Sequence, residues 1–457
     1  MPRHIIIVGA GVAGLTASIA LSTELKRRNE PYRISVFESR TKEAIGDGGA
    51  ISLTPLALYY FNTLGVLAEL DSMGEMAGLE VDGISVLSLH NGHFLQPLKF
   101  GGGSNGHSGK HKGRRVLRKA LFEAMLALAL KDTQVSVEFE KRVVTVREVP
   151  EAVILTFEDG SSAKGSLLLG CDGVHSVVRS QLVDPGHLSD YSGVSFIQTL
   201  STADRVGADP HFERSAIHLN RHGSFLATYC DKSHQSVFVA AVTHVNEFMV
   251  DKYRARALAT KNEEALTAIQ MALRHQVRCR FGKSTLPWIQ EWIDKTFDWA
   301  LYPVYQVKGC RKWYTAHTLL LGDAAHAMPP REESAAYAIE DSVLFAHIFA
   351  NGVDRPPIEL FQQYDNARRE EIRKAFDSTR RLWQSDLDKG LFPGQYRNFI
   401  STAYHSLNAD AEQDDQATLL NRSISAPTYE GMSDLSVHSL LYDSAHSLES
   451  EKRWTGP

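Results

Sequence analysis

The stretch His4-Ile5-Ile6-Ile7-Val8-Gly9-Ala10-Gly11-Val12-Ala13-Gly14 decides the fold of this chain. Its first half is a short apolar run rich in β-branched residues, which predicts a buried strand. Its second half is a GxGxxG pattern, and the apolar residues after it recur at helical spacing. A strand, a glycine-rich turn and a helix in this order predict a binding site for the pyrophosphate of a dinucleotide.

Each residue of this turn has a separate physical task. Gly9 allows the tight turn after the strand, and Gly11 lets the backbone approach the pyrophosphate, where a Cβ would collide with it. Gly14 lets the helix pack closely on the strand, and Val12 and Ala13 lie in the first helical turn. Free N–H groups at this helix end carry about half a positive charge, which attracts phosphate. All five residues are therefore predicted to bind the cofactor.

A carboxylate closes the second predicted strand. Ile34-Ser35-Val36-Phe37 is another apolar run, and Glu38 follows it directly. A carboxylate at this point accepts hydrogen bonds from ribose hydroxyls and repels a 2′-phosphate. Glu38 is therefore predicted to bind the ribose of the dinucleotide.

Two further acids follow buried strands farther along the chain. Asp172 comes after Leu167-Leu168-Leu169-Gly170-Cys171, and Asp323 comes after Leu319-Leu320-Leu321-Gly322. Ligands bind at the carboxyl edge of a parallel sheet, so Asp323 is predicted to reach a cofactor there. A plain NAD site needs only the glycine turn, whereas the longer FAD suits a chain that returns with a second acid. The alternatives are a helix cap for Asp323 and a turn residue for Asp172.

Length, charge and cysteine content exclude several classes of protein. A chain of 457 residues predicts about two to three domains. A formal net charge of −5 gives no reason to expect nucleic acid or an anionic membrane as a partner. Four scattered cysteines without a CxxC pair fit a reducing compartment and predict no metal site. The first strand leaves no room for a signal peptide, and no apolar run reaches the ~18 residues of a membrane span, so a cytoplasmic location is expected.

The order of strand and helix patterns predicts an interrupted domain. We expect an α/β fold in which a Rossmann-like FAD-binding domain is interleaved with a mixed or antiparallel β-sheet domain for the substrate, followed by C-terminal helices. The expected bounds are 1–72, 107–185 and 303–357 for the first domain, 73–106 and 186–302 for the second, and 358–457 for the C-terminal helix and tail. Helices are predicted over 55–70, 116–130, about 334–350 and 358–385, and a hairpin turn over 158–161.

Four motifs follow one another along the chain in a fixed order. They are the glycine turn with Glu38; residues 49–55 with Arg118-Lys119-Ala120-Leu121; residues 172–179; and residues 321–330 with Ile339-Glu340-Asp341. With these motifs the chain resembles, over roughly residues 4–385, the single-component (group A) FAD-dependent monooxygenases of the p-hydroxybenzoate and salicylate hydroxylase superfamily.

The resemblance implies FAD as the resident cofactor and NAD(P)H as the reductant. It implies that Arg118 contacts the FAD phosphate and ribityl region, that Asp323 accepts from the ribityl hydroxyls, and that Asp172 helps to organise both FAD and pyridine-nucleotide binding. Ala50 and Pro330 are further expected cofactor contacts. The resemblance also implies that a flavin C4a-hydroperoxide does the chemistry, so no catalytic side chain is assigned.

The substrate wall is expected on the middle sheet. Candidate side chains are Tyr191, His218, Tyr229 and Tyr302, with Phe225 and Phe238 as apolar lining. Many relatives carry a Trp-Arg pair where this chain reads Ile197-Gln198. The missing arginine favours a neutral aromatic or heteroaromatic small molecule, phenol-like or indole-like, which would be hydroxylated or epoxidised as in natural-product tailoring.

A second departure from the family pattern follows the Pro-Pro turn. Relatives carry a glycine-rich segment whose backbone closes on the flavin ring, whereas this chain reads Arg331-Glu332-Glu333-Ser334-Ala335-Ala336. Ser334, Ala335 and Ala336 still offer small side chains and free helix N–H groups, so we expect them to contact the flavin. Two alternatives stay open: a flavin dehydrogenase or oxidase that inserts no oxygen, and a degenerate FAD-binding protein without turnover.

Overall fold

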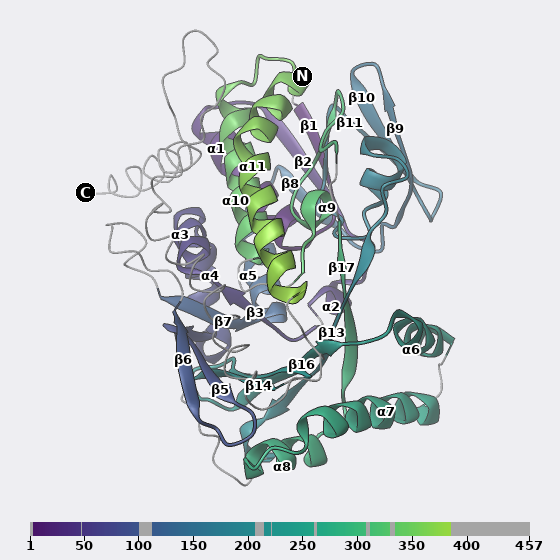
Figure 1. Cartoon of the computed structure of the whole chain (residues 1–457). Helices are drawn as coiled ribbons and strands as arrows, with labels where there is room; N and C mark the ends of the chain where they lie inside the picture. Colours follow the sequence, from purple (N-terminus) through teal and green to yellow (C-terminus); the bar gives the residue numbers. More distant parts are fainter. Residues whose placement is uncertain are drawn as a thin grey trace, which may run out of the picture.

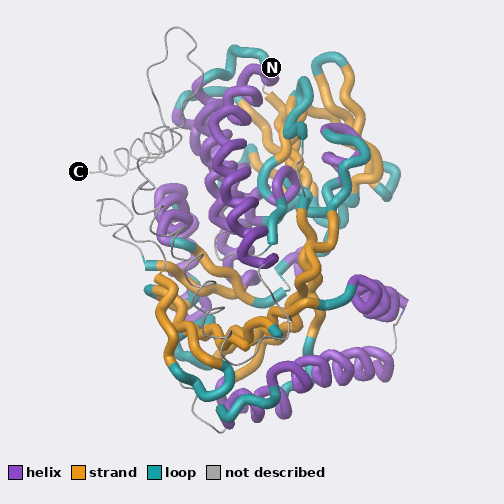
Figure 2. The backbone as a smooth tube through the Cα atoms, in the orientation of Figure 1, coloured by secondary structure: helices purple, strands orange, loops and turns teal. Residues whose placement is uncertain are grey.

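The molecule is built around two large sheets. One of them, together with the helices that cover it, lies above the other in Figures 1 and 2. The computed structural model describes residues 3–46, 48–99, 112–205, 214–220, 222–259, 263–307, 311–329 and 334–384. It confirms the predicted α/β class, with a parallel sheet interleaved along the chain with a larger, mostly antiparallel one. None of the helices in these ranges is long and apolar enough to cross a membrane.

The parallel sheet contains the predicted strand–turn–helix unit. Its strands are, in spatial order, β18 (Thr318–Leu320), β12 (Leu167–Gly170), β1 (Arg3–Val8), β2 (Tyr32–Phe37) and β8 (Val135–Glu138). All four pairings between them are parallel. Ile5, Ile6 and Ile7 of β1 are fully buried, which explains why the strand is apolar throughout. Parallel strands end at one edge of a sheet, so the turns after β18, β12, β1 and β2 lie side by side.

Helices from distant parts of the chain cover this sheet. The helix α1 (Val12–Arg27) packs against α10 (Ser334–Asn351), which in turn packs against α11 (Pro357–Gln384). The predicted helix 55–70 is wrong as a single element, because Gly65 has a left-handed φ of 89° and separates α3 (Pro55–Leu64) from α4 (Val66–Ser72). The predicted helix 116–130 begins two residues later, as α5 (Arg118–Ala129), because the preceding residues pair in a strand.

The second large sheet has seven strands. They are, in spatial order, β17 (Ala300–Gln306), β13 (Asp190–Thr202), β16 (Ser236–His244), β15 (Gly223–Tyr229), β14 (Ser215–Asn220), β5 (Gly83–Ser88) and β6 (Phe94–Lys99). Only the pairing of β14 with β5 is parallel. By pairing, β17 belongs wholly to this sheet, although the predicted boundary at 302/303 divides it. The division into domains remains a prediction.

Three helices lie between β16 and β17 in the chain, and two of them cover one face of the seven-stranded sheet. They are α6 (Glu247–Ala259), α7 (Glu263–Phe281) and α8 (Pro287–Lys295). A separate apolar core between this face and α7 and α8 contains the fully buried Phe225, Phe281, Trp288 and Trp292. In Figure 1, α7 and α8 lie below the sheet, and the parallel sheet lies above it. The upper face of the seven-stranded sheet is therefore available to form a site with the parallel sheet.

Smaller elements complete the described chain. Two three-stranded sheets are formed by β3 (Ala50–Leu53), β7 (Gly113–Leu117) and β4 (Leu79–Val81), and by β9 (Val143–Val149), β10 (Ala152–Phe157) and β11 (Ser162–Gly165). Short helical segments are α2 (Lys42–Ile45), α9 (Asp323–His326), a π-helical turn (Arg179–Val183) and two 3₁₀ turns (Gly74–Ala77 and Ala203–Arg205). The predicted hairpin turn joins β10 to β11.

Candidate active site

One cavity of about 980 Å³ lies between the carboxyl edge of the parallel sheet and the upper face of the seven-stranded sheet. The strand order β18, β12, β1, β2 places the turns of Asp323, Asp172, Gly9 and Glu38 along it in that sequence. Three strand spacings of about 4.8 Å separate the first turn from the last, which gives an edge of roughly 14 Å. An extended ligand can therefore contact all four turns.

The three glycines of the turn differ in what a Cβ at each position would contact. Gly9 has a φ of 99°, and a Cβ placed on it would lie 2.3 Å from the Cys171 carbonyl oxygen. A Cβ on Gly14 would lie 1.9 Å from the Gly9 oxygen, so this residue must be small for α1 to meet the strand. A Cβ on Gly11 meets no protein atom within 4 Å. The protein thus leaves open the space beside Gly11, where the phosphate is predicted to lie.

Glu38 is buried and lines the cavity at the end of β2. Its Oε2 accepts from the Ala10 N–H (3.0 Å), and its Oε1 accepts from the N–H and Nε of Arg40 (3.0 and 3.1 Å). The carboxylate therefore holds the glycine turn in place, and its remaining lone pairs can accept from a ligand in the cavity.

We expect Glu38→Ala to weaken FAD binding by about 1–3 kcal/mol, the cost of leaving buried polar partners unpaired. The measurement is a titration of FAD into apoprotein, followed by flavin fluorescence. Glu43→Ala is the matched control, because Glu43 is exposed on α2 and outside the cavity lining. Equal FAD affinity for the Glu38 and Glu43 variants would contradict the assignment.

Asp172 lines the cavity, but its carboxylate is bonded within its own loop. Its Oδ1 accepts from the Ser176 hydroxyl (2.5 Å), and its Oδ2 accepts from the N–H groups of Val177 and Val178 (2.7 and 3.1 Å). Burial raises the pKa of this carboxyl, while the hydrogen bond from Ser176 and those from the backbone oppose the rise. Asp172 thus caps the turn that follows β12, as in the alternative interpretation of the sequence, and shapes the cavity wall through that turn.

Asp323 and Arg118 line the cavity with charged groups that make no hydrogen bond to the described protein. Asp323 begins α9, its side chain is exposed to the cavity, and its carboxylate makes no hydrogen bond to any residue that the structure describes. Its position deep in the protein desolvates this carboxyl and raises its pKa, while the positive charges of His326 and Arg118 act in the opposite direction. Arg118 is half-buried at the start of α5, and its guanidinium likewise makes no hydrogen bond within the described ranges. An acceptor and a cation of this kind suit hydroxyl and phosphate groups.

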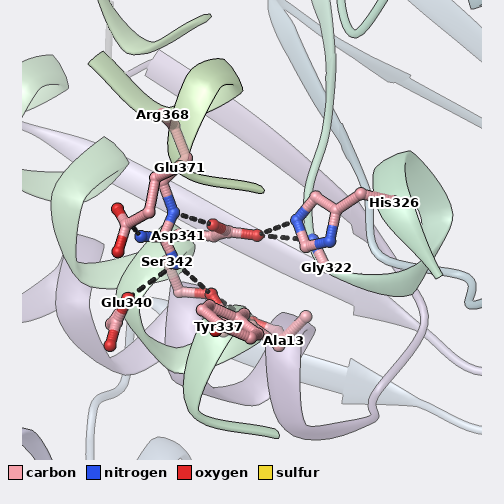
Figure 3. A network of polar contacts seen from close by, with 10 residues as sticks. Ala13, Gly322, His326, Tyr337, Glu340, Asp341, Ser342, Arg368 and Glu371 are labelled. Atoms are coloured by element: carbon pink, nitrogen blue, oxygen red, sulfur yellow. Dashed lines mark hydrogen bonds and ion pairs between the residues drawn. The ribbon is translucent and has the colours of Figure 1, made fainter. Parts of the chain in front are cut away.

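A buried ionic network fixes the turn before Asp323 (Figure 3). Asp341 accepts from the Gly322 N–H (3.0 Å), from His326 Nε2 (2.6 Å) and from Arg368 Nε (2.7 Å). Burial acts to raise the pKa of Asp341, but the charges of His326 and Arg368 hold that pKa well below its usual range. His326 is buried and absent from the cavity lining, so its contact is with Asp341 rather than with a ligand in the cavity. Helices α10 and α11 therefore position the turn that presents Asp323.

Alternation along the strands decides which residues of the seven-stranded sheet reach the cavity. Successive side chains of a strand point to opposite faces. Phe196, Gln198, Ile217, Leu219, Ser224, Leu226, Phe238 and Val242 line the cavity, whereas Ala216 and His218 of β14 and Phe225, Ala227 and Tyr229 of β15 point to the opposite face, which α7 and α8 cover. The cavity face is thus mainly apolar.

The structure corrects three of the predicted substrate-wall candidates, two of them through this alternation. His218 is fully buried on the opposite face, with its ring 5.0 Å from Trp288, and burial lowers its pKa to about 4. Tyr229 also points to that face and stacks on His234. The Tyr191 hydroxyl is bonded to Ser195 Oγ (2.8 Å) and the Val245 carbonyl (2.9 Å), and it is not in the lining. The apolar candidate Phe225 is likewise outside the lining, because it lies in the second core.

The other predicted residues divide into three groups. Those in the cavity lining are Gly9, Gly11, Val12, Ala13, Glu38, Ala50, Arg118, Asp172, Phe238, Tyr302, Asp323 and Ala335. Gly14 and Ala336 are not in the lining and act at most through packing. Pro330, Arg331, Glu332 and Glu333 lie outside the described residues, and of Ser334 only its place at the start of α10 is described.

Several residues of the cavity lining carry no sequence signal that would mark them as contacts. They are Arg40, Gly48, Ser52, Arg115, Lys141, Arg142 and Tyr305. Arg40 lies two residues after Glu38, and Arg115 precedes the predicted helix in β7, but neither pattern indicates a side chain's direction. The sequence marks Gln198 only as the residue that stands where many relatives carry an arginine. Among the described residues, no group of three or more His, Cys, Asp or Glu side chains is placed to hold a metal.

These residues fit FAD on three independent observations. The space beside Gly11 is open to a phosphate, the Asp323 carboxylate has no protein partner in the described chain, and the Arg118 guanidinium is equally uncommitted. The roughly 14 Å edge from Glu38 to Asp323 suits a ligand longer than a mononucleotide. The fit is between the protein's own groups and the hydroxyls and phosphates of the cofactor.

Comparisons with known proteins agree with this geometry. The family model described as FAD binding domain matches residues 3–379. A 3-amino-4-hydroxybenzoate 2-monooxygenase of Streptomyces platensis is 26% identical over 384 residues, which are 83% of this chain and 87% of that protein. A 2-heptyl-3-hydroxy-4(1H)-quinolone synthase of Pseudomonas aeruginosa is 27% identical over 387 residues, 83% and 90% of the two chains. The crystal structure of Klebsiella pneumoniae HpxO complexed with FAD and uric acid is similar in fold, with a TM-score of 0.67, 18% identity and coverage of 98% and 97%.

Proposed function

This chain belongs to the FAD binding domain family of flavoprotein monooxygenases, and we propose that it oxygenates a neutral, electron-rich aromatic or heteroaromatic small molecule with NAD(P)H and O₂. The product would be hydroxylated or epoxidised, as in natural-product tailoring. One oxygen atom enters the substrate, the other leaves as water, and NAD(P)H supplies two electrons. Bound FAD supplies the electron transfer and the activation of O₂.

The cavity face of the seven-stranded sheet is the observation that carries the substrate class. Its lining side chains are mainly apolar, and the only ionisable ones from this sheet among the described residues are the tyrosines Tyr302 and Tyr305. Burying a charged substrate against such a face would cost free energy without a partner on the sheet. A flat, uncharged ring loses little on leaving water and gains apolar contact.

The two ends of the cavity support separate roles. The cofactor roles of Glu38, Arg118 and Asp323 are proposals, supported by their charges and by their order along the edge of the parallel sheet. The cavity-lining residues of the seven-stranded sheet would orient the substrate and exclude water, which protects the oxygenating step from side reactions. The named relatives, which act on an aminohydroxybenzoate and form a quinolone, are consistent with a ring substrate.

The test is NADPH and NADH oxidation by purified holoenzyme with a panel of phenols, indoles and quinolones, with the product mass measured for each. We expect at least one neutral member to stimulate oxidation and to gain the mass of one oxygen atom. Stimulation with hydrogen peroxide as the only oxygen product would instead show an oxidase. Protein without bound flavin would indicate a degenerate site.

A further inference from the structure

Two residues with amide side chains, Gln198 and Asn220, are in the cavity lining from the seven-stranded sheet, and they differ in the hydrogen bonds that they can still make with a ligand. Asn220 is committed at both ends, since its Nδ2 donates to the Arg280 carbonyl (2.8 Å) and its Oδ1 accepts from the His222 N–H (2.8 Å). Gln198 donates from Nε2 to the Gly48 carbonyl (3.2 Å). That bond assigns the amide orientation, and Oε1 accepts no hydrogen bond from any residue in the described ranges.

Strand register shows what surrounds this free acceptor. Gln198 pairs with Ala240 of β16 on one side and with Ala300 of β17 on the other, so small side chains flank the amide. Phe196 lies two residues away on the same face of β13, and Phe238 lies two residues from Ala240 on β16. Neighbours of this kind lie about 5–8 Å apart. Gln198 therefore lies between Phe196 and Phe238 on the sheet, and all three residues line the cavity.

The same place is tied to the predicted cofactor end of the cavity. A Cβ on Gly49 would lie 2.4 Å from the Phe238 ring, so Phe238 packs directly on the backbone there. The neighbouring Gly48 accepts from Gln198, and the Gly49 carbonyl accepts from the Arg118 N–H (3.0 Å). Gln198 and Phe238 thus contact Gly48 and Gly49, and Gly49 also binds the backbone of Arg118.

Building on the proposed function, we propose that the substrate carries a ring N–H or O–H group, that Gln198 Oε1 accepts the hydrogen bond from it, and that Phe196 and Phe238 contact the ring. A neutral amide oxygen accepts from a neutral donor without requiring a counter-charge. An analogue without that donor would leave the oxygen buried and unpaired, which sites of this kind penalise strongly. Gln198 then selects the substrate class rather than taking part in the oxygen transfer.

Matched ligand pairs test the proposal on the oxidised holoenzyme, through the change that binding causes in the FAD absorption spectrum. The pairs are 2-quinolinone with N-methyl-2-quinolinone, indole with N-methylindole, and phenol with anisole, and benzoate is the anionic probe because Arg115 of β7 also lines the cavity. We expect the donor-bearing member of at least one pair to bind about tenfold tighter or more than its methylated partner. We also expect benzoate to bind more weakly than phenol.

Three variants separate the acceptor from the bond to Gly48. Gln198→Leu removes both the acceptor and the bond to Gly48, so it should bind the two members of a pair with equal affinity. Gln198→Glu keeps an acceptor and loses the donor to Gly48, so it should keep the discrimination. Gln362→Leu is the control for the substitution itself, since Gln362 is exposed on α11 and outside the lining, and it should behave as wild type. The FAD content of each variant is measured alongside.

Several results would overturn the proposal. They are equal binding within every pair in wild type, no spectral change with any donor-bearing probe, discrimination that survives in Gln198→Leu, and benzoate binding tighter than phenol. Loss of discrimination in Gln198→Glu as well would assign the effect to the Gly48 contact and would contradict the role of Oε1. Because the readout needs no turnover, discrimination without an oxygenated product would refute the proposed function and would still show that Gln198 Oε1 accepts a hydrogen bond from a bound ring compound.

Discussion

Gly11→Val should yield a folded protein that has lost almost all of its FAD. A Cβ on Gly11 meets no protein atom within 4 Å, and the residue has an extended backbone (φ −74°) that any side chain adopts. The substitution should therefore change the free energy of unfolding of the apoprotein by only about 1 kcal/mol, mostly through the weaker helix cap. The valine fills the space beside the helix N-terminus where the pyrophosphate is predicted to bind.

Gly9→Ala is the informative comparison, because it fails for another reason. Its φ of 99° is strained for alanine, and its Cβ would lie 2.3 Å from a backbone oxygen. We expect that variant to unfold at lower temperature even without FAD. The flavin absorbance per protein and the thermal unfolding of the apoprotein, measured for both variants, separate the two effects. If the Gly11→Val protein is yellow and fully loaded with FAD, the prediction that the pyrophosphate binds at this turn is wrong.

Asp323→Ala should lower FAD affinity a hundredfold or more while the apoprotein stays folded. Hydrogen bonds to a charged group contribute about 1.5–3 kcal/mol each, and a tenfold change in affinity corresponds to about 1.4 kcal/mol. Two ribityl hydroxyls on this carboxylate account for the expected loss. The fold should tolerate the change, because the carboxylate makes no hydrogen bond to the described protein.

Titration of FAD into the apoprotein measures this loss, and circular dichroism checks the fold. Asp354→Ala is the matched control, since Asp354 is exposed beyond the end of α10 and outside the cavity lining, and its FAD affinity should equal that of wild type. Wild-type affinity in the Asp323 variant would show that this acid only caps α9.

The edge of the parallel sheet could be predicted because each of its turns leaves a local signal. An apolar run fixes the strand, a glycine or an acid at its end fixes the turn, and parallel pairing brings all such turns to one edge. Gly9, Glu38 and Asp323 were found in this way, and all three line the cavity. What the sequence could not show is that Asp172 has both oxygens bonded to its own loop, because that depends on the conformation of the turn.

The substrate face was harder to predict for a physical reason. Alternation says that neighbours on a strand point to opposite faces, but it does not say which face the helices cover. Trp288 and Trp292 of α8 occupy the face to which His218 and Tyr229 point, so those candidates are buried away from the cavity. Gln198 was noticed for the arginine it replaces, and its free acceptor emerges only from the contact with Gly48.

Incorporation of oxygen from ¹⁸O₂ tests the central claim most directly. Purified holoenzyme is supplied with NADPH, ¹⁸O₂ and the neutral ring compound that most stimulates NADPH oxidation, and the product is analysed by mass spectrometry with H₂¹⁸O under ¹⁶O₂ as the control. The account predicts one ¹⁸O atom per product molecule from O₂ and none from water. NADPH consumption that yields only hydrogen peroxide, or a product labelled from water, would contradict it.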